Sequence, residues 1–281
     1  MNKIEWGYAV NQWETESYEY VRTESIERMF KVLASCDFRM IELNSGSGRW
    51  ATLGRPEQIK RVFGSARDFV SFMNSCDIQR VGGWYYNPGR PYEEEGVISR
   101  DPADQQDWAG IIEAVRPYAD CLSEIGGSYI AATPLLDLQT GALSPDDQIK
   151  YAAECWNKVG AMSLEYGIKT TLRVSPMSAI QDRKALDLLL SQTNPETVGF
   201  SLDAAVLLNA GFDVAGIIQD HGNRIKACCF KTSEGIDLLP TYTILREASC
   251  SEEIVLDSAP SANPAESVML NNWYVKQVWC E

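Results

Sequence analysis

The stretch 198–233 constrains the fold of this chain more than any other. It opens with the apolar run VGFSLD, passes through a segment with helical spacing, and closes with a second apolar run, IKACCFK. This order of strand, helix and strand predicts a crossover between two parallel strands. The polar residues that end the two strands, Asp203 and Lys231, should therefore meet at one edge of the sheet, where parallel sheets and barrels place their chemistry.

The same alternation extends over the whole chain. Strands are predicted at 4–13, 39–44, 78–89, 127–134, 167–174, 198–203, 225–231 and 253–258. Helices are predicted at 18–35, 56–76, 104–125, 144–166, 181–192, 204–220, 236–248 with a break at Pro240, and 263–278.

Eight pairs of strand and helix predict an α/β fold, a (β/α)8 TIM barrel that forms a single domain over residues 1–281. Such barrels typically have about 250 residues, which fits this length. A doubly wound open sheet is the alternative. It normally carries a GxGxxG turn after its first strand, and AVNQWET at that place has none.

The charge of the chain restricts its partners. With a formal net charge of -14, it should be repelled by nucleic acids and by anionic membranes, so we expect neither as a partner. Eight cysteines are scattered through apolar runs without a CxxC pattern, which is typical of buried thiols in a reduced cytoplasm. The first residues, MNKIEWGYAV, lack the apolar core of a signal peptide. We therefore expect a cytoplasmic protein with a small-molecule substrate.

Aromatic side chains near the C-terminus bear on oligomerisation. Trp273, Tyr274 and Trp279 are expected to pack either against the start of the barrel or against another subunit, which leaves a homo-oligomer open. The single histidine, His221, precedes the seventh strand and should lie at the end of a helix, away from the carboxyl ends of the strands. Histidine-dependent triads, bases and metal sites are thereby excluded.

The carboxyl ends of the eight strands should converge on one pocket. The candidate catalytic residues there are Glu42, Arg173, Asp203 and Lys231. The candidate substrate-binding residues are Asn11, Trp13, Asn44, Trp84, Tyr86, Cys229 and Asp257. Aromatic faces suit the C–H faces of sugars or a planar ring, and carboxylates and amides suit hydroxyl groups.

Each candidate also has a structural interpretation. Asp203 can cap the helix that begins directly after it. Arg173 and Lys231 can neutralise the nearby carboxylates instead of binding a substrate. Cys229 can be a small core thiol, since no histidine lies close in sequence to activate it.

Six segments of the chain resemble the xylose-isomerase-like barrels, the sugar phosphate isomerase and epimerase group that also includes inosose dehydratases and the endonuclease IV type of nuclease. The matching segments are GYAVNQW, IELNSGSGRW, VGGWYYNPG, SLDAAVLLNAGFDV, CCFKTS and IVLDSAPSANPAES. The resemblance spans nearly the whole chain and implies the same barrel. It also implies an isomerase, epimerase, dehydratase or other lyase, because the group includes all of these.

The resemblance further implies a divalent metal (Mn, Mg or Zn), held by carboxylates and histidines at the ends of the late strands. Asp203 stands where one ligand is expected, and Asp257 is a displaced carboxylate in the eighth strand. The other expected ligand positions carry Arg173, Val206 and Cys229. We interpret the arginine as a fixed cation in place of the metal, because one certain carboxylate ligand and an arginine do not hold a hard divalent ion.

These observations lead to three functional hypotheses. The first is a metal-independent isomerase, epimerase or lyase, with no cofactor, acting on a small hydroxylated carbonyl compound that is sugar-like or an aromatic specialised metabolite. In it Arg173 and Lys231 stabilise an enolate or alkoxide while Glu42 or Asp203 moves the proton. The second is a metal-dependent sugar isomerase or epimerase with a rearranged site of Glu42, Asp203 and Asp257. The third is a non-catalytic barrel that binds a ligand.

Overall fold

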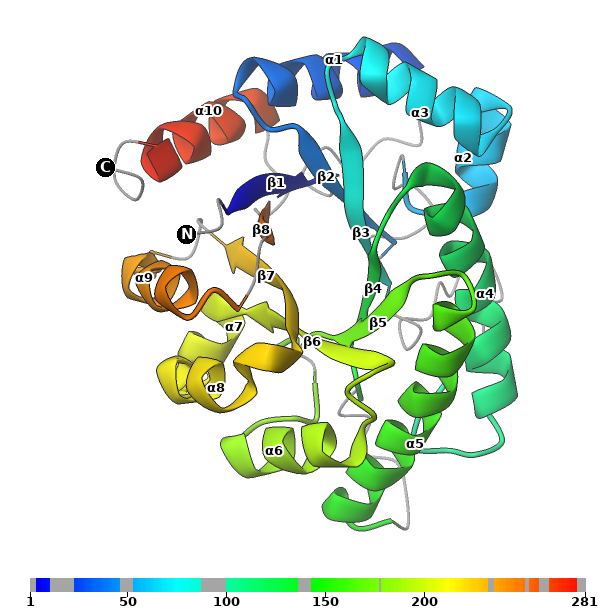
Figure 1. The fold of residues 1–281 in the computed structure, drawn as a ribbon, viewed down its shortest axis with the longest axis vertical. Helices are drawn as coiled ribbons and strands as arrows, with labels where there is room; N and C mark the ends of the chain where they lie inside the picture. Colours follow the sequence, from blue (N-terminus) through cyan, green and yellow to red (C-terminus); the bar gives the residue numbers. More distant parts are fainter. Residues whose placement is uncertain are drawn as a thin grey trace.

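The computed structural model describes residues 4–10, 23–45, 53–86, 100–135, 143–176, 178–231, 235–250, 253–257 and 263–276. Eight parallel strands pair in chain order, and the first pairs with the last, so the barrel is closed (Figure 1). The strands are β1 (Glu5–Ala9), β2 (Met40–Asn44), β3 (Arg80–Tyr86), β4 (Tyr129–Ala132), β5 (Lys169–Leu172), β6 (Val198–Asp203), β7 (Ile225–Lys231) and β8 (Glu253–Asp257). The predicted (β/α)8 fold is confirmed.

Helices surround the barrel as an outer ring (Figure 1). They are α1 (Thr23–Ser35), α2 (Pro56–Phe63), α3 (Ala66–Ser75), α4 (Trp108–Ile125), α5 (Pro145–Leu164), α6 (Arg183–Gln192), α7 (Ala204–Asn209), α8 (Val214–His221), the short 3-10 helix η3 (Gly222–Arg224), α9 (Leu239–Ala248) and α10 (Pro264–Tyr274). Their apolar faces pack on the outward side chains of the strands, and this layer forms the main hydrophobic core. The inward side chains are left to fill the barrel.

The predicted helix 56–76 is in fact two helices, α2 and α3. Gly64 ends α2 with a φ of +88°, a conformation that side chains with a Cβ rarely adopt. Ser65 then begins α3, since its hydroxyl accepts a hydrogen bond from the backbone N–H of Asp68 at 3.1 Å. Apolar residues keep a helical spacing on both sides of this turn, so the sequence pattern predicted one helix instead of two.

Two other predicted helices also differ. The segment 204–220 is split into α7 and α8 around Gly211, which has a φ of +79°, and Asp213 caps α8 by accepting from the N–H of Gly216 at 3.0 Å. Pro240 does not break the helix predicted at 236–248. It lies in the first turn of α9, where a missing N–H costs nothing.

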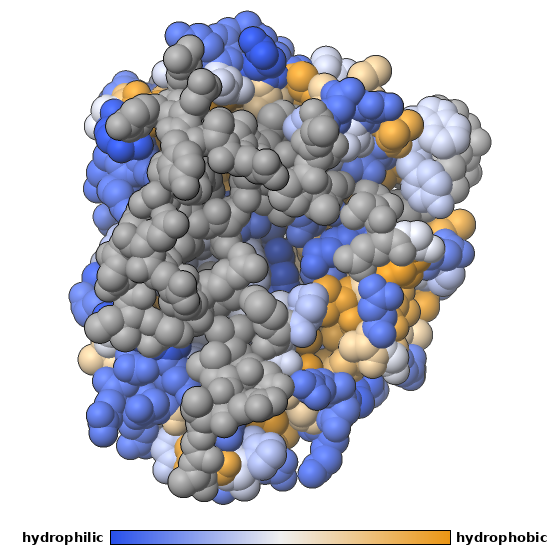
Figure 2. All heavy atoms as spheres, turned by 180° about the vertical axis from the view of Figure 1, so that it is seen from behind, coloured by the Kyte–Doolittle hydropathy of each residue, from blue (hydrophilic) through white to orange (hydrophobic). Residues whose placement is uncertain are grey.

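The aromatic residues of α10 are largely exposed: Trp273 is 59% exposed and Tyr274 is 40% exposed, while Trp279 lies outside the described residues. Packing of these residues against the start of the barrel or against another subunit stays a prediction. Figure 2 shows that hydrophilic residues cover much of the described part of one face, in keeping with the net charge.

The described cysteines are free thiols, as predicted. Six of them are buried and Cys250 is partly buried, while Cys280 lies outside the described residues. None of the described helices has the length and apolar character needed to cross a bilayer.

Candidate active site

A buried ion pair occupies the interior of the barrel. Glu42 points inward from β2, and Arg173 follows the last residue of β5. Nη1 of the arginine donates to Oε1 of Glu42 at 2.9 Å and Nη2 donates to Oε2 at 2.5 Å, which is bidentate geometry. Nε donates to the hydroxyl of Ser201 in β6 at 3.1 Å. Glu42 is 1% exposed and Arg173 is 4% exposed, so both charges are almost fully removed from water.

Two tyrosines complete this buried network. The hydroxyl of Tyr129 in β4 donates to Oε2 of Glu42 at 2.7 Å. The ring of Tyr85 in β3 lies over the guanidinium of Arg173, with its centroid 5.1 Å from the central carbon, and its hydroxyl is 2.9 Å from that of Thr133. Glu42 therefore accepts hydrogen bonds on both oxygens.

Burial and the neighbouring charges set the protonation states of the groups in this network. Burial opposes the charge on Arg173, but the Glu42 carboxylate outweighs it and holds the pKa of the guanidinium well above its ordinary value. Burial, and then the charge of Glu42, raises the pKa of the Tyr129 hydroxyl well above its usual range. At neutral pH the arginine is a cation and the tyrosine is a hydrogen-bond donor.

A second ion pair lies nearer the opening of the barrel. Nζ of Lys231, the last residue of β7, is 3.0 Å from Oδ2 of Asp203, the last residue of β6. Oδ1 of the same aspartate accepts from the N–H of Val206 at 3.1 Å, so Asp203 pairs with the lysine and also caps α7. The lysine side chain is 22% exposed and that of the aspartate 3%, which makes Lys231 the more accessible member.

Lys231 remains protonated at neutral pH. Burial lowers the pKa of its ammonium group, but the nearby Asp203, Cys229 and Asp257 outweigh this and raise the pKa above the ordinary value. An ammonium group of this kind can stabilise a developing oxyanion. It is poorly suited to attack a carbonyl, because the nucleophilic form of lysine is the neutral amine.

The neighbouring strand ends supply further polar groups. Asp257 of β8 lies opposite Lys231 in the register of the sheet, and the thiol of Cys229 donates to its Oδ2 at 3.8 Å. Cys229 is fully buried, and burial raises the pKa of its thiol well above the usual range, so it is a protonated thiol at neutral pH. Its contact with a substrate stays a prediction. Asn44 ends β2 two residues after Glu42 and is 9% exposed.

The placement of the aromatic residues in β3 corrects the sequence prediction. Trp84 and Tyr86, expected in the pocket, pack against Tyr118 of α4, with ring centroids 4.9 and 4.5 Å away. Tyr85 is the residue of β3 that lies inside the barrel. The register between β2 and β3 shifts after Ile41, and this irregularity changes which β3 residues point inward in a way that the sequence does not reveal.

The structure thus brings together Glu42 with Arg173 and Asp203 with Lys231, and places Asp257 beside the lysine. Asn11 and Trp13 lie outside the described residues. Sequence reasoning missed two residues of the buried network, Tyr129 and Ser201. Tyr85 belongs to the aromatic end of the third predicted strand, but it was not among the candidate substrate-binding residues. Side chains alternate between the two faces of a strand, so Ser201, which lies two residues before the inward-facing Asp203, could have been predicted to point inward as well.

The described residues do not fit a hard divalent cation. None of their His, Cys, Asp and Glu side chains form a group of three or more that could hold a metal ion. The oxygens of Glu42 are engaged by Arg173 and Tyr129, those of Asp203 by Lys231 and a helix N-terminus, and the remaining sulfur ligand is a protonated thiol. Mg²⁺, Mn²⁺ and Zn²⁺ need several unprotonated donors that are free to converge.

Comparisons with known proteins agree on the fold. No protein-family model matches the chain. Inosose dehydratases from two strains of Clostridium perfringens are 24% identical over 154 residues, which are 53% of this chain and 49% of each relative. The chain therefore spans about half the length of the curated relatives it matches.

Solved structures match over nearly the whole chain. A sugar phosphate isomerase/epimerase from Parabacteroides distasonis has a TM-score of 0.71 at 15% identity, covering 99% of this chain and 95% of that one. A D-allulose 3-epimerase from Methylomonas in complex with D-allulose has a TM-score of 0.70 at 15% identity, covering 97% and 91%.

A third structure, the IOLI protein with a zinc atom bound, has a TM-score of 0.70 at 13% identity, covering 96% of this chain and 97% of that one. These likenesses confirm the barrel that the sequence resemblance implied. The chain has the same closed (β/α)8 fold as these three structures.

Proposed function

We propose that this protein is an enzyme that transfers a proton at a carbon next to a carbonyl group, and that its substrate is a small hydroxylated compound such as a ketose or an inosose. Its reaction is an isomerisation, an epimerisation or a dehydration. Two proteins of similar fold, a sugar phosphate isomerase/epimerase and a D-allulose 3-epimerase, are named for reactions of such compounds, and inosose dehydratases match about half of this chain. The pair of Asp203 and Lys231 at the opening of the barrel carries the proposal.

The pair offers the two functions that this chemistry requires. Lys231 donates a hydrogen bond to the carbonyl oxygen of the substrate, and Asp203 accepts the proton from the neighbouring carbon. The electrons of the C–H bond then form the enolate, whose negative oxygen is stabilised by the ammonium group. Protonation of the enolate from the opposite face by a second carboxylic acid, for which Asp257 is the candidate, gives an epimer, and Asp203 keeps the abstracted proton. An isomer forms when the hydroxyl group of the deprotonated carbon passes its proton to the enolate oxygen and Asp203 returns the carbon proton to the former carbonyl carbon. A dehydration product forms when the enolate expels the hydroxyl group of the next carbon, which leaves as water with the proton held by Asp203.

Asp203 is the better candidate of the two carboxylates for moving the proton. Both carboxylates are buried and accept hydrogen bonds on both oxygens, but the partner of Glu42 is the buried Arg173, whereas the partner of Asp203 is Lys231, whose side chain is 22% exposed near the opening of the barrel. We propose that Glu42 and Arg173 form the rigid base of the site. Asp203 is then the proton acceptor, with Asp257 as the second carboxylate beside Lys231.

The proposed reaction does not require a divalent metal. The carboxylates of Glu42 and Asp203 are paired with Arg173 and Lys231, and Lys231 provides positive charge where the reaction develops negative charge. The competing hypothesis, a rearranged metal site of Glu42, Asp203 and Asp257, would require Glu42 and Asp203 to give up these cationic partners. Metal analysis of protein purified without chelator, followed by assay in excess EDTA, separates the two hypotheses.

The reaction class can be tested before the substrate is known. Purified protein is incubated in D₂O with a panel of ketoses and inososes, and exchange of the C–H group next to the carbonyl is followed by NMR. We expect exchange in at least one compound, undiminished by EDTA. Asp203→Asn should reduce the rate about 10²-fold or more, because it removes the base and keeps a side-chain acceptor for the helix cap.

Lys231→Gln should reduce exchange to a similar degree, while the control Lys184→Gln, at a lysine whose side chain is 81% exposed, should not affect it. Exchange that survives both active-site changes would contradict the proposal, and activity that EDTA abolishes would favour the metal hypothesis.

A non-catalytic binding barrel is the second candidate function. The observation that favours it is that the carboxylates of Glu42 and Asp203 are both already compensated by cations. It predicts saturable binding of a compound from the panel without exchange, and binding that persists in Asp203→Asn.

A further inference from the structure

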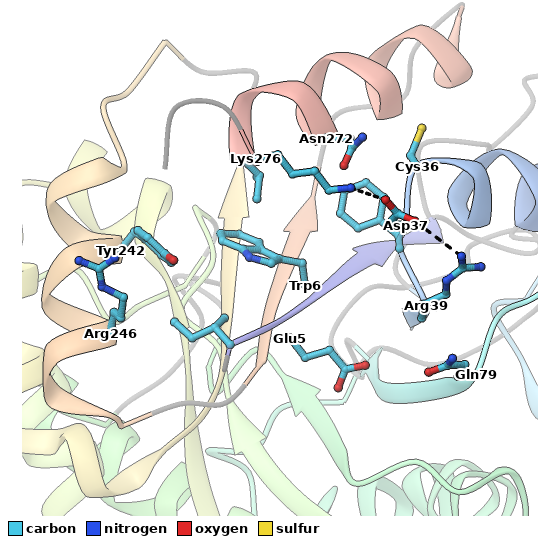
Figure 3. Close-up of a pocket in the computed structure, with 13 residues that line it drawn as sticks. Glu5, Trp6, Cys36, Asp37, Arg39, Gln79, Tyr242, Arg246, Asn272 and Lys276 are labelled. Carbon is cyan, nitrogen blue, oxygen red and sulfur yellow. Dashed lines mark hydrogen bonds and ion pairs between the residues drawn. The ribbon is translucent and has the colours of Figure 1, made fainter. Parts of the chain in front are cut away.

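A cavity lies at the opposite end of the barrel from the proposed active site. It has a volume of about 660 Å³ and is lined by residues at or before the starts of β1, β2 and β3, together with residues of α9 and α10 (Figure 3). Cavities of roughly 300–1,000 Å³ are the usual size of small-molecule sites. The amino-terminal face of such barrels ordinarily serves stability rather than catalysis, so this cavity is not explained by the proposed reaction.

Aromatic side chains form the apolar surface of this cavity. Trp6 of β1 lies at its centre in Figure 3, with Tyr242 of α9 beside it. Their ring centroids are 5.5 Å apart and the rings are inclined by 35°. Phe230 supports Trp6 from within the core through an edge contact with ring centroids 6.4 Å apart. A planar ring can lie against such a surface with favourable dispersion and stacking.

The described residues that line the cavity carry an excess of positive charge. Among them are three cations, Arg39, Arg246 and Lys276, and two acids, Glu5 and Asp37.

The acids are both engaged. Glu5 pairs with Arg80, and Asp37 is shared by Arg39, at 3.7 Å, and Lys276 (Figure 3). The Lys276 ammonium accordingly lowers the pKa of Asp37.

Arg246 is the cation least compensated. Its guanidinium carbon lies 5.6 Å from the centroid of the Tyr242 ring, and within the described residues it has no acidic partner. This local excess of positive charge is unusual in a chain whose net charge is -14. An aromatic surface next to an uncompensated arginine matches a ligand with an apolar ring and one anionic group.

We propose that this cavity is a second ligand site, separate from the proposed active site, for a small planar aromatic carboxylate. The ring lies against Trp6 and Tyr242, and the carboxylate pairs with Arg246. The proposal does not depend on the reaction at the other end of the barrel, since it uses none of the same residues.

Calorimetric titration with 2-naphthoate tests the site, and the uncharged analogue 2-naphthylmethanol provides the comparison. We expect one molecule of 2-naphthoate to bind per chain. Arg246→Gln should weaken this binding about fivefold and should leave binding of the alcohol unchanged. Arg246 is exposed, so its replacement should not disturb folding.

Two control variants locate the effect. Arg67→Gln removes an exposed arginine of α3 that does not line the cavity, and Lys231→Gln alters the proposed active site; neither should change the affinity for 2-naphthoate. Perturbation of the Trp6 indole N–H signal by 2-naphthoate, assigned with Trp6→Phe, should confirm the place of binding.

Three results would overturn the proposal: the absence of saturable binding at millimolar concentration, an affinity unaffected by Arg246→Gln, or an affinity lost in Lys231→Gln. The last would place the ligand in the other pocket.

Discussion

Glu42→Gln is the sharpest test of the buried ion pair. The substitution keeps the shape of the side chain and an oxygen that can accept from Tyr129, but it removes the negative charge that compensates Arg173. Arg173 is 4% exposed, so its guanidinium is almost fully removed from bulk water. Removing one partner of a buried pair typically costs about 3–5 kcal/mol, because the other charge stays buried and unpaired. We expect the free energy of unfolding to fall by about this amount.

The assay is urea unfolding at neutral pH, followed by circular dichroism. Lys150→Gln is the matched control, because its partner Asp147 and Lys150 itself are about half exposed, at 48% and 51%. Exposed pairs of this kind contribute about 0–1 kcal/mol. The double variant Glu42→Gln with Arg173→Met should be more stable than Glu42→Gln alone, since it removes the uncompensated cation as well.

A loss of less than about 1 kcal/mol in Glu42→Gln, similar to the control, would refute this reasoning. It would mean that the arginine is compensated by groups other than Glu42. A double variant less stable than Glu42→Gln would likewise show that the cost does not come from an unpaired charge.

Three further predictions concern the rest of the fold. Burial raises the pKa of Cys121 and of Cys155 to about 12, so above about pH 9 the unfolded chain releases protons that the folded chain keeps. The free energy of unfolding should therefore fall with rising pH by about 1.4 kcal/mol per pH unit for each thiol, and Cys121→Ala or Cys155→Ala should reduce that slope in urea titrations; an unchanged slope would contradict this. Ser65→Ala should cost about 1 kcal/mol in the same assay, because it removes the cap that begins α3, and no loss would argue for one continuous helix. A Cβ at position 83 would lie 2.3 Å from the buried ring of Tyr129, so Gly83→Ala should lower stability by about 1–3 kcal/mol, and an unchanged melting temperature would show that the ring can move.

The candidate site was predictable from the sequence only in part. Asp203 and Lys231 were predicted to meet because each ends a strand of one crossover unit, and the structure places them 3.0 Å apart. Trp84 and Tyr86 were assigned to the pocket because strand-end aromatics are plausible there, and the register shift beside β3 turned both of them toward α4. A strand has a side-chain period of two, so a displacement of one residue exchanges its faces.

The repeating order of strands and helices could be inferred from the amino-acid sequence alone, and with it the barrel and the edge where polar residues gather. Those signals are local, because hydrophobic spacing and caps act within a few residues. The pairing of Arg173 with Glu42, 131 residues away, and the hydrogen bond from Tyr129 to Glu42 arise only in the folded barrel. Such pairing depends on strand register and on the closure of the barrel. Both are set by contacts between distant segments, which produce no periodic pattern in the amino-acid sequence.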